Sequence, residues 1–488
     1  MKTKTVSILL GIIIVAKLFL TFIQQGRISL DGDMCSIIIP SESYKPVMKD
    51  PFAVNVLLNN KIYASPNRSF AHWTMYSYFR TVPFFLQLFT NKIDSIYASA
   101  ALAKTLIQAF FIFLLASLAG NTNNIRSLDF LIPAAVISFL FQIYDLNSVL
   151  GLIQSSITYT FFYSLPLCLI LYLFHSLYFL EKNGGWKNAG IFRKSILILL
   201  PVFLSLNGPL NTGVAIIACP LILLYLIWKN RKQMYNSEGN LQLKQTYQLV
   251  PKSVRIVFSI FIFFSMYSLY IGKNNAESLN HTLSLPERYH RMIEVLPEFF
   301  TGNIAMPILI LFPVISLFFT DNFIHKNDFI PAKNIALGIF IFTLVYVALL
   351  PFGGYRVYRP TILRTDTFTP VLVCLFYLAG RTSYELIQSN SGWKKNLSIV
   401  WTIAFTVYFG MWDISLYKQN RYERAALQTL AKSTEKMVEL KTDCTVMSWV
   451  PLTDYRESEL NCKLLKYWGA IQTPDFYFQK PDSPDKLK

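Results

Sequence analysis

Long blocks of apolar residues recur along this 488-residue chain and constrain its fold more than any other feature. Each block is about 17–22 residues long, the length that crosses the hydrocarbon core of a bilayer as an α-helix. Only 15% of the residues are charged, which is low for a soluble domain. The sequence therefore predicts an all-α polytopic membrane protein with about eleven transmembrane helices. The expected spans are 6–24, 98–119, 129–145, 158–180, 195–210, 213–229, 255–272, 304–320, 334–351, 368–387 and 397–415.

Basic residues are unevenly distributed among the short loops that join these spans. Lysine and arginine gather in alternate loops, whereas the loops 146–157 and 208–212 contain neither. Since positively charged loops remain in the cytoplasm, this asymmetry predicts a cytoplasmic N-terminus and, after an odd number of crossings, an extracytoplasmic C-terminus. The same bias accounts for the net charge of +17 without nucleic acid as a partner. The residues that mark the basic loops are Lys182, Lys187, Arg193, Lys194, Lys229, Arg231, Lys232, Lys244, Lys252, Arg255, Arg381, Lys394 and Lys395.

The chain divides into a membrane domain, 1–415, and a small extracytoplasmic C-terminal domain, 416–488. The membrane domain includes a long first outer loop, 25–97, which is aromatic enough to form short helices lying in the membrane interface. Lys17 and Lys104 interrupt apolar spans, and we expect both side chains to reach the membrane surface by snorkelling.

The C-terminal tail has the pattern of a small α/β element. Apolar spacing over 421–440 predicts an amphipathic helix, 445–450 is typical of a strand, and a second short helix is expected over 457–467. Cys444 and Cys462 both lie in this tail and could pair in an oxidising compartment, although their spacing leaves the pairing open.

Two carboxylates, Asp31 and Asp33, flank Gly32 directly after the first span. Neighbouring carboxylates repel each other, and burial in a cleft would raise the pKa of one of them. Such a group is a suitable general base for a hydroxyl. The alternative is a solvated turn, since Asp-Gly pairs are common in turns.

Arginines gather in the segment 353–366, which lies between two apolar spans on the expected outer side. Arg356, Arg359 and Arg364 oppose the usual depletion of positive charge there. Their forked guanidinium groups suit the phosphate of a lipid. Two alternatives are unspecific contacts with phospholipid headgroups and an ion pair with Asp366.

A polar and aromatic group in the first loop could bind a sugar or an acceptor. Arg68, His72 and Trp73 offer hydrogen bonds and a ring for stacking, and an aromatic belt at the membrane interface is the alternative. Asp145, at the end of the third span, and Tyr355, beside the arginines, are further candidates. No paired CxxC motif, HExxH helix or phosphate-binding glycine loop is present in the sequence, so no metal ligands are assigned.

This layout resembles the GT-C superfamily of integral membrane glycosyltransferases. Members have many spans, a long first outer loop, acidic residues just after the first helix and arginine or lysine in later outer loops. Asp31 and Asp33 match the acidic position, and Arg356, Arg359 and Arg364 match the phosphate position. The narrower similarity is to bacterial envelope members of the O-antigen glucosyltransferase type.

The resemblance implies inverting transfer of a sugar from a polyprenyl-phosphate donor to an envelope glycan or lipid acceptor. The reaction would occur at the outer face of the cell inner (cytoplasmic) membrane. Asp33 or Asp31 would take the proton of the acceptor hydroxyl, and the arginines would stabilise the departing phosphate. No cofactor is expected, and a divalent metal is possible but not expected. Membrane lipids are expected partners, and nucleic acid is not.

Three other classes remain open. An O-antigen polymerase or ligase also has many spans and outer arginines, but its large outer loops usually come later in the chain. A transporter or flippase of lipid-linked glycans would have charged or broken helices at mid-membrane. Pro201, Pro220 and Pro313 could break spans in that way. The third class is a non-enzymatic scaffold of the envelope.

Overall fold

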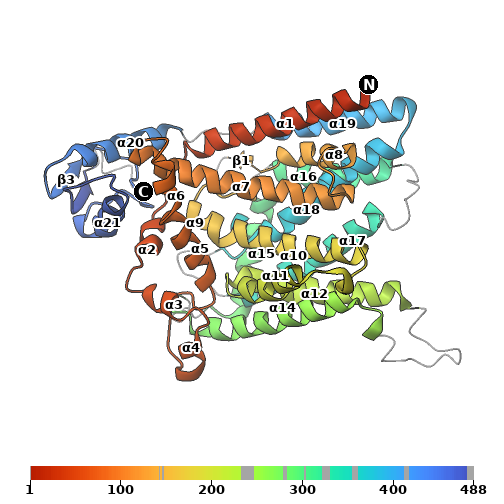
Figure 1. Ribbon diagram of the computed structural model, residues 1–488, viewed down its shortest axis with the longest axis horizontal. Helices are drawn as coiled ribbons and strands as arrows, with labels where there is room; N and C mark the ends of the chain where they lie inside the picture. The colour runs from red at the N-terminus through yellow and green to blue at the C-terminus, as the bar shows by residue number, and fades with distance from the viewer. Residues whose placement is uncertain are drawn as a thin grey trace.

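The apolar blocks of the sequence form a bundle of roughly parallel helices in a computed structural model (Figure 1). The structure describes residues 2–141, 143–145, 148–231, 247–277, 283–301, 304–320, 330–353, 361–411 and 417–480. Each predicted span overlaps a helix in the described part of the chain. These helices are α1 (Lys2–Gln25), α7 (Lys92–Gly120), α8 (Leu128–Ser138), α10 (Leu165–Lys182), α11 (Ile191–Ser205), α12 (Pro209–Lys229), α14 (Lys252–Ile271), α16 (Ala305–Phe319), α17 (Ala332–Leu349), α18 (Thr365–Ser389) and α19 (Gly392–Met411).

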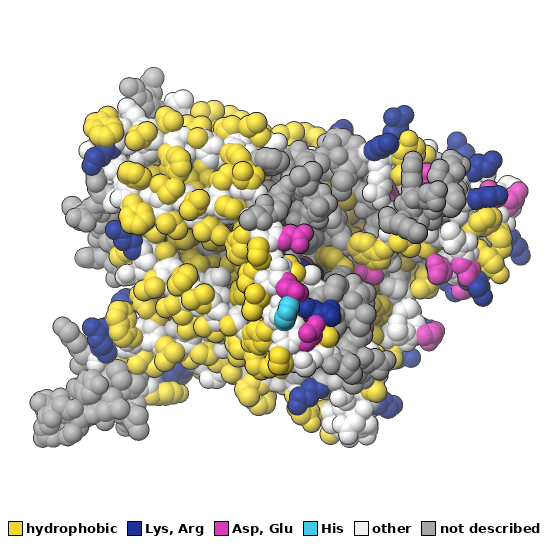
Figure 2. Space-filling model, turned by 180° about the vertical axis from the view of Figure 1, so that it is seen from behind, with side chains coloured by type: hydrophobic (Ala, Val, Ile, Leu, Met, Phe, Trp, Pro, Cys, Tyr) yellow, Lys and Arg dark blue, Asp and Glu magenta, His cyan; other side chains and the backbone are white. Residues whose placement is uncertain are grey.

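Six helical stretches in the described part of the chain are long and apolar enough to cross a membrane. They are α1, α7, the run Ile157–Lys182, α12, the run Lys252–Asn274 and the run Ala332–Phe352. Hydrophobic side chains cover much of the face of the bundle that Figure 2 shows, as expected of helices that face lipid. The structure therefore agrees with a multi-pass membrane protein.

Helix α8 is shorter than the predicted span 129–145. It ends at Ser138, and residues Ile143–Asp145 form strand β1, which pairs antiparallel with β2 (Ser148–Leu150). The prediction extended the helix because the apolar run continues past its true end.

Helix α18 lies at the centre of the bundle, against α7, α8 and α16, and is buried along most of its length. Arg381 belongs to this helix, so its assignment to a cytoplasmic loop is wrong. It forms a buried ion pair with Glu385 and donates to the carbonyl of Ala119 at the end of α7 (2.9 Å). The guanidinium group thereby donates a hydrogen bond to a buried carbonyl at the C-terminus of α7, where carbonyls have no hydrogen-bond donor within the helix.

The two lysines within apolar spans do not snorkel. Lys104 is buried and donates to the backbone carbonyl of Ser155. Lys17 is buried with its ammonium group 5.6 Å from the centre of the Phe139 ring. Both ammonium groups therefore contact partners inside the protein and do not reach the membrane surface.

The first loop and the tail lie together at the end of the bundle opposite the N-terminus (Figure 1). The loop forms five short helices, namely α2 (Met34–Ile38), α3 (Lys45–Lys49), α4 (Val54–Asn59), α5 (Ser69–Phe79) and α6 (Val82–Leu86). The tail comprises α20 (Tyr417–Lys432), β3 (Met437–Leu440), α21 (Glu459–Tyr467) and β4 (Phe476–Gln479), and its two strands pair in parallel.

Two details of the predicted tail are wrong. The first helix ends at Lys432, and residues Met437–Leu440 form a strand instead of its last turn. Residues 445–450 contain no strand, and 446–450 form bends. The second helix agrees with its prediction, and Cys444 and Cys462 are both free thiols.

One hydrophobic core joins the tail to the first loop. Trp468 is almost completely buried, and its indole N–H donates to the carbonyl of Phe79 (2.9 Å). Glu423 of α20 accepts hydrogen bonds from the backbone N–H of Leu30 (3.0 Å), the hydroxyl of Tyr97 (2.7 Å) and the backbone N–H of Met447 (2.9 Å). Burial raises the pKa of Glu423 to about 7.

Candidate functional site

Asp31 is buried and bound by five hydrogen-bond donors. Its Oδ1 accepts from the backbone N–H groups of Asp33 (3.1 Å) and Met34 (3.0 Å) and from the hydroxyl of Thr158 (2.7 Å). Its Oδ2 accepts from the hydroxyl of Ser156 (2.8 Å) and the backbone N–H of Thr158 (2.9 Å). Through these bonds Asp31 connects the first loop to the start of α9 (Ile157–Tyr159).

Asp33 has a different environment. It is half-buried, and its Oδ1 accepts from the indole N–H of Trp449 in the tail (3.1 Å). Gly32 permits this contact, because a Cβ at that position would lie 2.7 Å from Cδ1 of Trp449. Of the two acidic candidates, Asp33 is therefore the one at the surface where the loop meets the tail.

Two of the predicted basic residues line one cavity. It has a volume of about 340 Å³ and is bounded mainly by apolar side chains of α12, α17 and the turn Leu350–Phe352. Arg68, Arg364 and Asn275 supply polar groups, and Tyr163 and Tyr346 supply aromatic rings. The lining is thus amphipathic, with two arginines among side chains that are largely apolar.

Arg68 is 8% exposed, and no described residue accepts a hydrogen bond from its Nε. Its guanidinium carbon lies 4.9 Å from the centre of the Phe162 ring and 5.6 Å from that of Tyr163. Gly208, with φ of +119°, leaves room for it, since a Cβ there would lie 3.3 Å from Nε. A buried guanidinium group whose Nε has no acceptor among the described residues is costly and is a suitable receptor for an anion.

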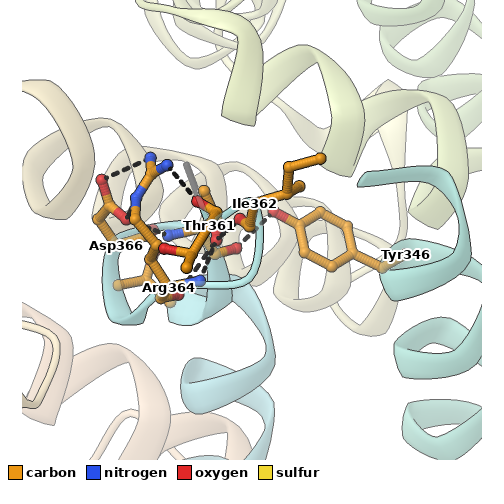
Figure 3. Close-up of polar contacts among 7 residues, drawn as sticks. Tyr346, Thr361, Ile362, Arg364 and Asp366 are labelled. Atoms are coloured by element: carbon orange, nitrogen blue, oxygen red, sulfur yellow. Dashed lines mark hydrogen bonds and ion pairs between the residues drawn. The ribbon is translucent and has the colours of Figure 1, made fainter. Parts of the chain in front are cut away.

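Arg364 forms the ion pair that the sequence left open as an alternative (Figure 3). Its Nε and Nη2 donate to the two carboxylate oxygens of Asp366 at 2.9 and 3.2 Å, and its Nη1 donates to the carbonyl of Thr361 (2.9 Å). Tyr346 reaches the same turn by donating to the carbonyl of Thr367 (2.8 Å). Arg364 is therefore a fixed cation whose charge is partly neutralised.

An amphipathic helix, α15 (Leu285–Thr301), is attached to the rim of the cavity. Arg288 donates to the carbonyls of Pro351 (3.2 Å) and Gly353 (3.1 Å). Tyr289 donates to the carbonyl of Ala348 at the end of α17 (2.6 Å). These bonds hold α15 against the turn Leu350–Phe352 that follows α17.

The carboxylates do not line this cavity in the described structure, but a short segment connects the two regions. Thr158, at the start of α9, binds Asp31, and Tyr163, five residues later in the π-helical turn Thr160–Ser164, lines the cavity. Five residues of helix advance about 8 Å. Trp449, which binds Asp33, also lies 5.7 Å from Tyr159, which lies 5.7 Å from Tyr163 (ring centres).

The sugar-binding trio of the first loop is not assembled as predicted. His72 is 1% exposed, and its Nδ1 lies 2.9 Å from the carbonyl of Arg68. Burial lowers the pKa of His72 to about 4, so the ring is neutral at pH 7. The indole N–H of Trp73 donates to the carbonyl of Met48 (3.0 Å). Only Arg68 of the three lines the cavity.

Several predicted residues lie outside the described part of the chain. They are Tyr355, Arg356 and Arg359, together with the side chain of Asp145. Among the described residues, no group of three or more histidine, cysteine, aspartate or glutamate side chains is arranged to bind a metal.

Trp449, Tyr159 and Gly208 belong to this region but were not singled out from the sequence. A tryptophan inside a short apolar run has the pattern of a buried strand residue, and its contact with Asp33 spans 416 positions. Asn-Gly-Pro at 207–209 did indicate a turn, but only the structure shows that Gly208 borders Arg68. Comparisons of the chain with family models, curated proteins and solved structures found no match.

Proposed function

We propose that this protein is a membrane glycosyltransferase of GT-C type that transfers a sugar from a polyprenyl-phosphate donor. The observation that carries the proposal is Arg68, a buried guanidinium group in an otherwise largely apolar cavity, with Arg364 in the same lining. A lipid phosphate matches both properties, because its head is anionic and its chain is apolar.

A second cavity offers space for the chain of such a lipid. It has a volume of about 410 Å³ and an almost wholly apolar lining from α10, α12, α17 and α18. The two cavities follow one another along α12, from Leu210 in the first to Tyr225 in the second. This stretch of helix is about 22 Å long, most of the thickness of a bilayer core.

Asp33 is the proposed general base. It takes the proton of an acceptor hydroxyl as that oxygen forms a bond to the anomeric carbon of the donor sugar. The bond between that carbon and the phosphate oxygen breaks, configuration inverts, and the polyprenyl phosphate leaves with the electron pair. Arg68 and Arg364 stabilise its developing charge, and the apolar surroundings strengthen that interaction.

We further propose about eleven membrane-crossing helices, since the five predicted spans beyond the six apolar stretches also fall on helices. In this topology the first loop and the tail face the outside of the inner membrane and the N-terminus faces the cytoplasm. The acceptor is an envelope glycan or lipid on that outer side.

The test is a transfer assay in membranes supplied with polyprenyl-phosphate sugars, comparing wild type with Asp33→Asn. We expect turnover to fall roughly 100- to 10,000-fold while donor binding persists, because a general base contributes about that much. Glu435→Gln, at an exposed carboxylate of the tail, is the matched control. Unchanged turnover in Asp33→Asn would refute the proposed base. Movement of the lipid across the bilayer without glycoside formation would instead support a lipid-linked glycan transporter.

A further inference from the structure

Trp449 is an exposed aromatic residue in a fixed position beside the candidate base. It is 51% exposed, although Val446 and Met447 just before it are buried. Three contacts orient it, namely the hydrogen bond from its N–H to Asp33, the close approach of Gly32 and the ring of Tyr159 at an interplanar angle of 33°. An exposed indole held on three sides is preorganised to receive a ligand on its open face.

From the position of this ring we infer that Trp449 and Tyr159 form a platform that binds a saccharide acceptor. This inference rests on the proposed function and adds the chemical class of its second substrate. Sugar rings have apolar C–H faces and hydroxyl edges, so an aromatic face next to a carboxylate matches both. A hydroxyl at the edge of a sugar seated on Trp449 lies next to Asp33, the group proposed to remove its proton.

The platform also lies near the proposed donor cavity. Tyr159 is 5.7 Å from Tyr163, whose ring is part of the cavity lining and lies 5.6 Å from the guanidinium carbon of Arg68. An acceptor on Trp449 and a donor phosphate at Arg68 are therefore separated by two neighbouring tyrosine rings. Tyr159 and Tyr163 thus connect the platform to the cavity through contacts between rings.

The main alternative for an exposed tryptophan in a membrane protein is insertion into the lipid interface. Three substitutions distinguish the functions of this ring. Trp449→Phe keeps an aromatic face and removes the N–H bond to Asp33, whereas Trp449→Ala removes both. Gly32→Ala leaves the ring intact but displaces it, since the added Cβ would lie 2.8 Å from the backbone nitrogen of Trp449.

The experiment measures binding of the full-length protein in nanodiscs to an array of short neutral oligosaccharides of hexoses and N-acetylhexosamines. We expect wild type to retain a subset of them and Trp449→Ala and Gly32→Ala to weaken retention roughly three- to tenfold, with Trp449→Phe intermediate. Trp393→Ala is the matched control, because Trp393 is 73% exposed at the start of α19, outside the tail and the cavity lining. Thermal unfolding of each variant verifies that the tail is folded.

Three results would overturn the inference. They are no retention of any oligosaccharide by wild type, equal retention by folded Trp449→Ala, and a loss confined to binding of plain phospholipid vesicles. Failure of the proposed function has a different outcome. Saccharide retention that depends on Trp449, in a protein that neither binds prenyl phosphate nor forms glycoside, leaves the platform standing and removes the transferase.

Discussion

Substitution of Arg68 by glutamine separates binding of the donor from stability of the fold. The guanidinium group is buried, and no described residue accepts a hydrogen bond from its Nε. A hydrogen bond between charged partners contributes about 1.5–3 kcal/mol. We therefore expect Arg68→Gln to weaken binding of a prenyl phosphate roughly 10- to 150-fold. Arg68→Lys retains the positive charge but not the forked guanidinium group, so this variant should weaken prenyl phosphate binding less than Arg68→Gln does.

The folded protein without ligand should tolerate the same change. Removing a buried charge relieves a desolvation cost, while the loss of ring contacts with Phe162 and Tyr163 costs about 0.5–2 kcal/mol. These effects oppose each other, so the free energy of unfolding should change by about 1 kcal/mol or less. A residue that served only the fold would show the reverse pattern, with stability lost and affinity retained.

The assay is equilibrium binding of farnesyl phosphate to protein in nanodiscs, with thermal unfolding of the same samples. Arg126→Gln removes an exposed arginine from the loop between α7 and α8 and controls for net charge. If Arg68→Gln binds farnesyl phosphate as tightly as wild type does, the phosphate site is not this cavity. If the variant unfolds, Arg68 is structural and the reasoning from its unpaired Nε is wrong.

Three further predictions concern neighbouring residues. Gly208→Ala should destabilise the protein by about 1–3 kcal/mol and weaken farnesyl phosphate binding, because φ is +119° and the added Cβ would approach Arg68. Gly213→Ala is the control: Gly213 is in the same cavity lining, and only Tyr346 lies within 4 Å of its added Cβ, so stability and binding should both be unchanged. Asp31→Asn should lower the melting temperature, because the amide NH2 of the new side chain would face the hydrogen-bond donors that now bind Asp31, at a cost of about 1–3 kcal/mol. Asp33→Asn should leave the melting temperature nearly unchanged. Glu423 has a pKa of about 7 in the folded protein, above its ordinary 4.5, so folding favours its protonated form. The free energy of unfolding should therefore fall by about 3 kcal/mol as pH rises from 4.5 to 7 and then level off. Glu423→Gln should remove this pH dependence from the melting curves. Melting curves of the wild type that rise over that pH range would contradict the last prediction.

The helices could be predicted from the sequence because a membrane span is a local property. Twenty apolar residues bury their backbone polar groups within the helix itself, so length and composition are sufficient. The expected ranges 213–229 and 334–351 correspond closely to α12 (Pro209–Lys229) and α17 (Ala332–Leu349). The prediction was least accurate where an apolar run continues beyond the end of its helix, as it does after Ser138.

The site could be predicted only in part, because its members meet through contacts between distant segments. The acidic pair was found by its position after the first span, but the sequence could not show that Asp31 is bound by five donors while Asp33 meets Trp449. Arg68 was predicted with His72, but Arg68 directly precedes helix α5, and the first turn of that helix buries His72 in the core. The strands of the tail were predicted wrongly for the same reason, because strand Met437–Leu440 pairs with a segment that is distant in the sequence, Phe476–Gln479.

The core that the tail shares with the first loop has a consequence for biosynthesis. Leu30 and Glu423, which bond across this core, are 393 positions apart in the chain. At about 5–20 residues per second, a ribosome needs roughly 20–80 s to synthesise that interval. Throughout this time the newly made loop has no tail to cover Met34, Ile37 and Phe79, which are buried in the finished protein. Early release of the nascent chain would therefore leave an apolar surface open to proteases and aggregation, even with nearly every membrane helix already inserted.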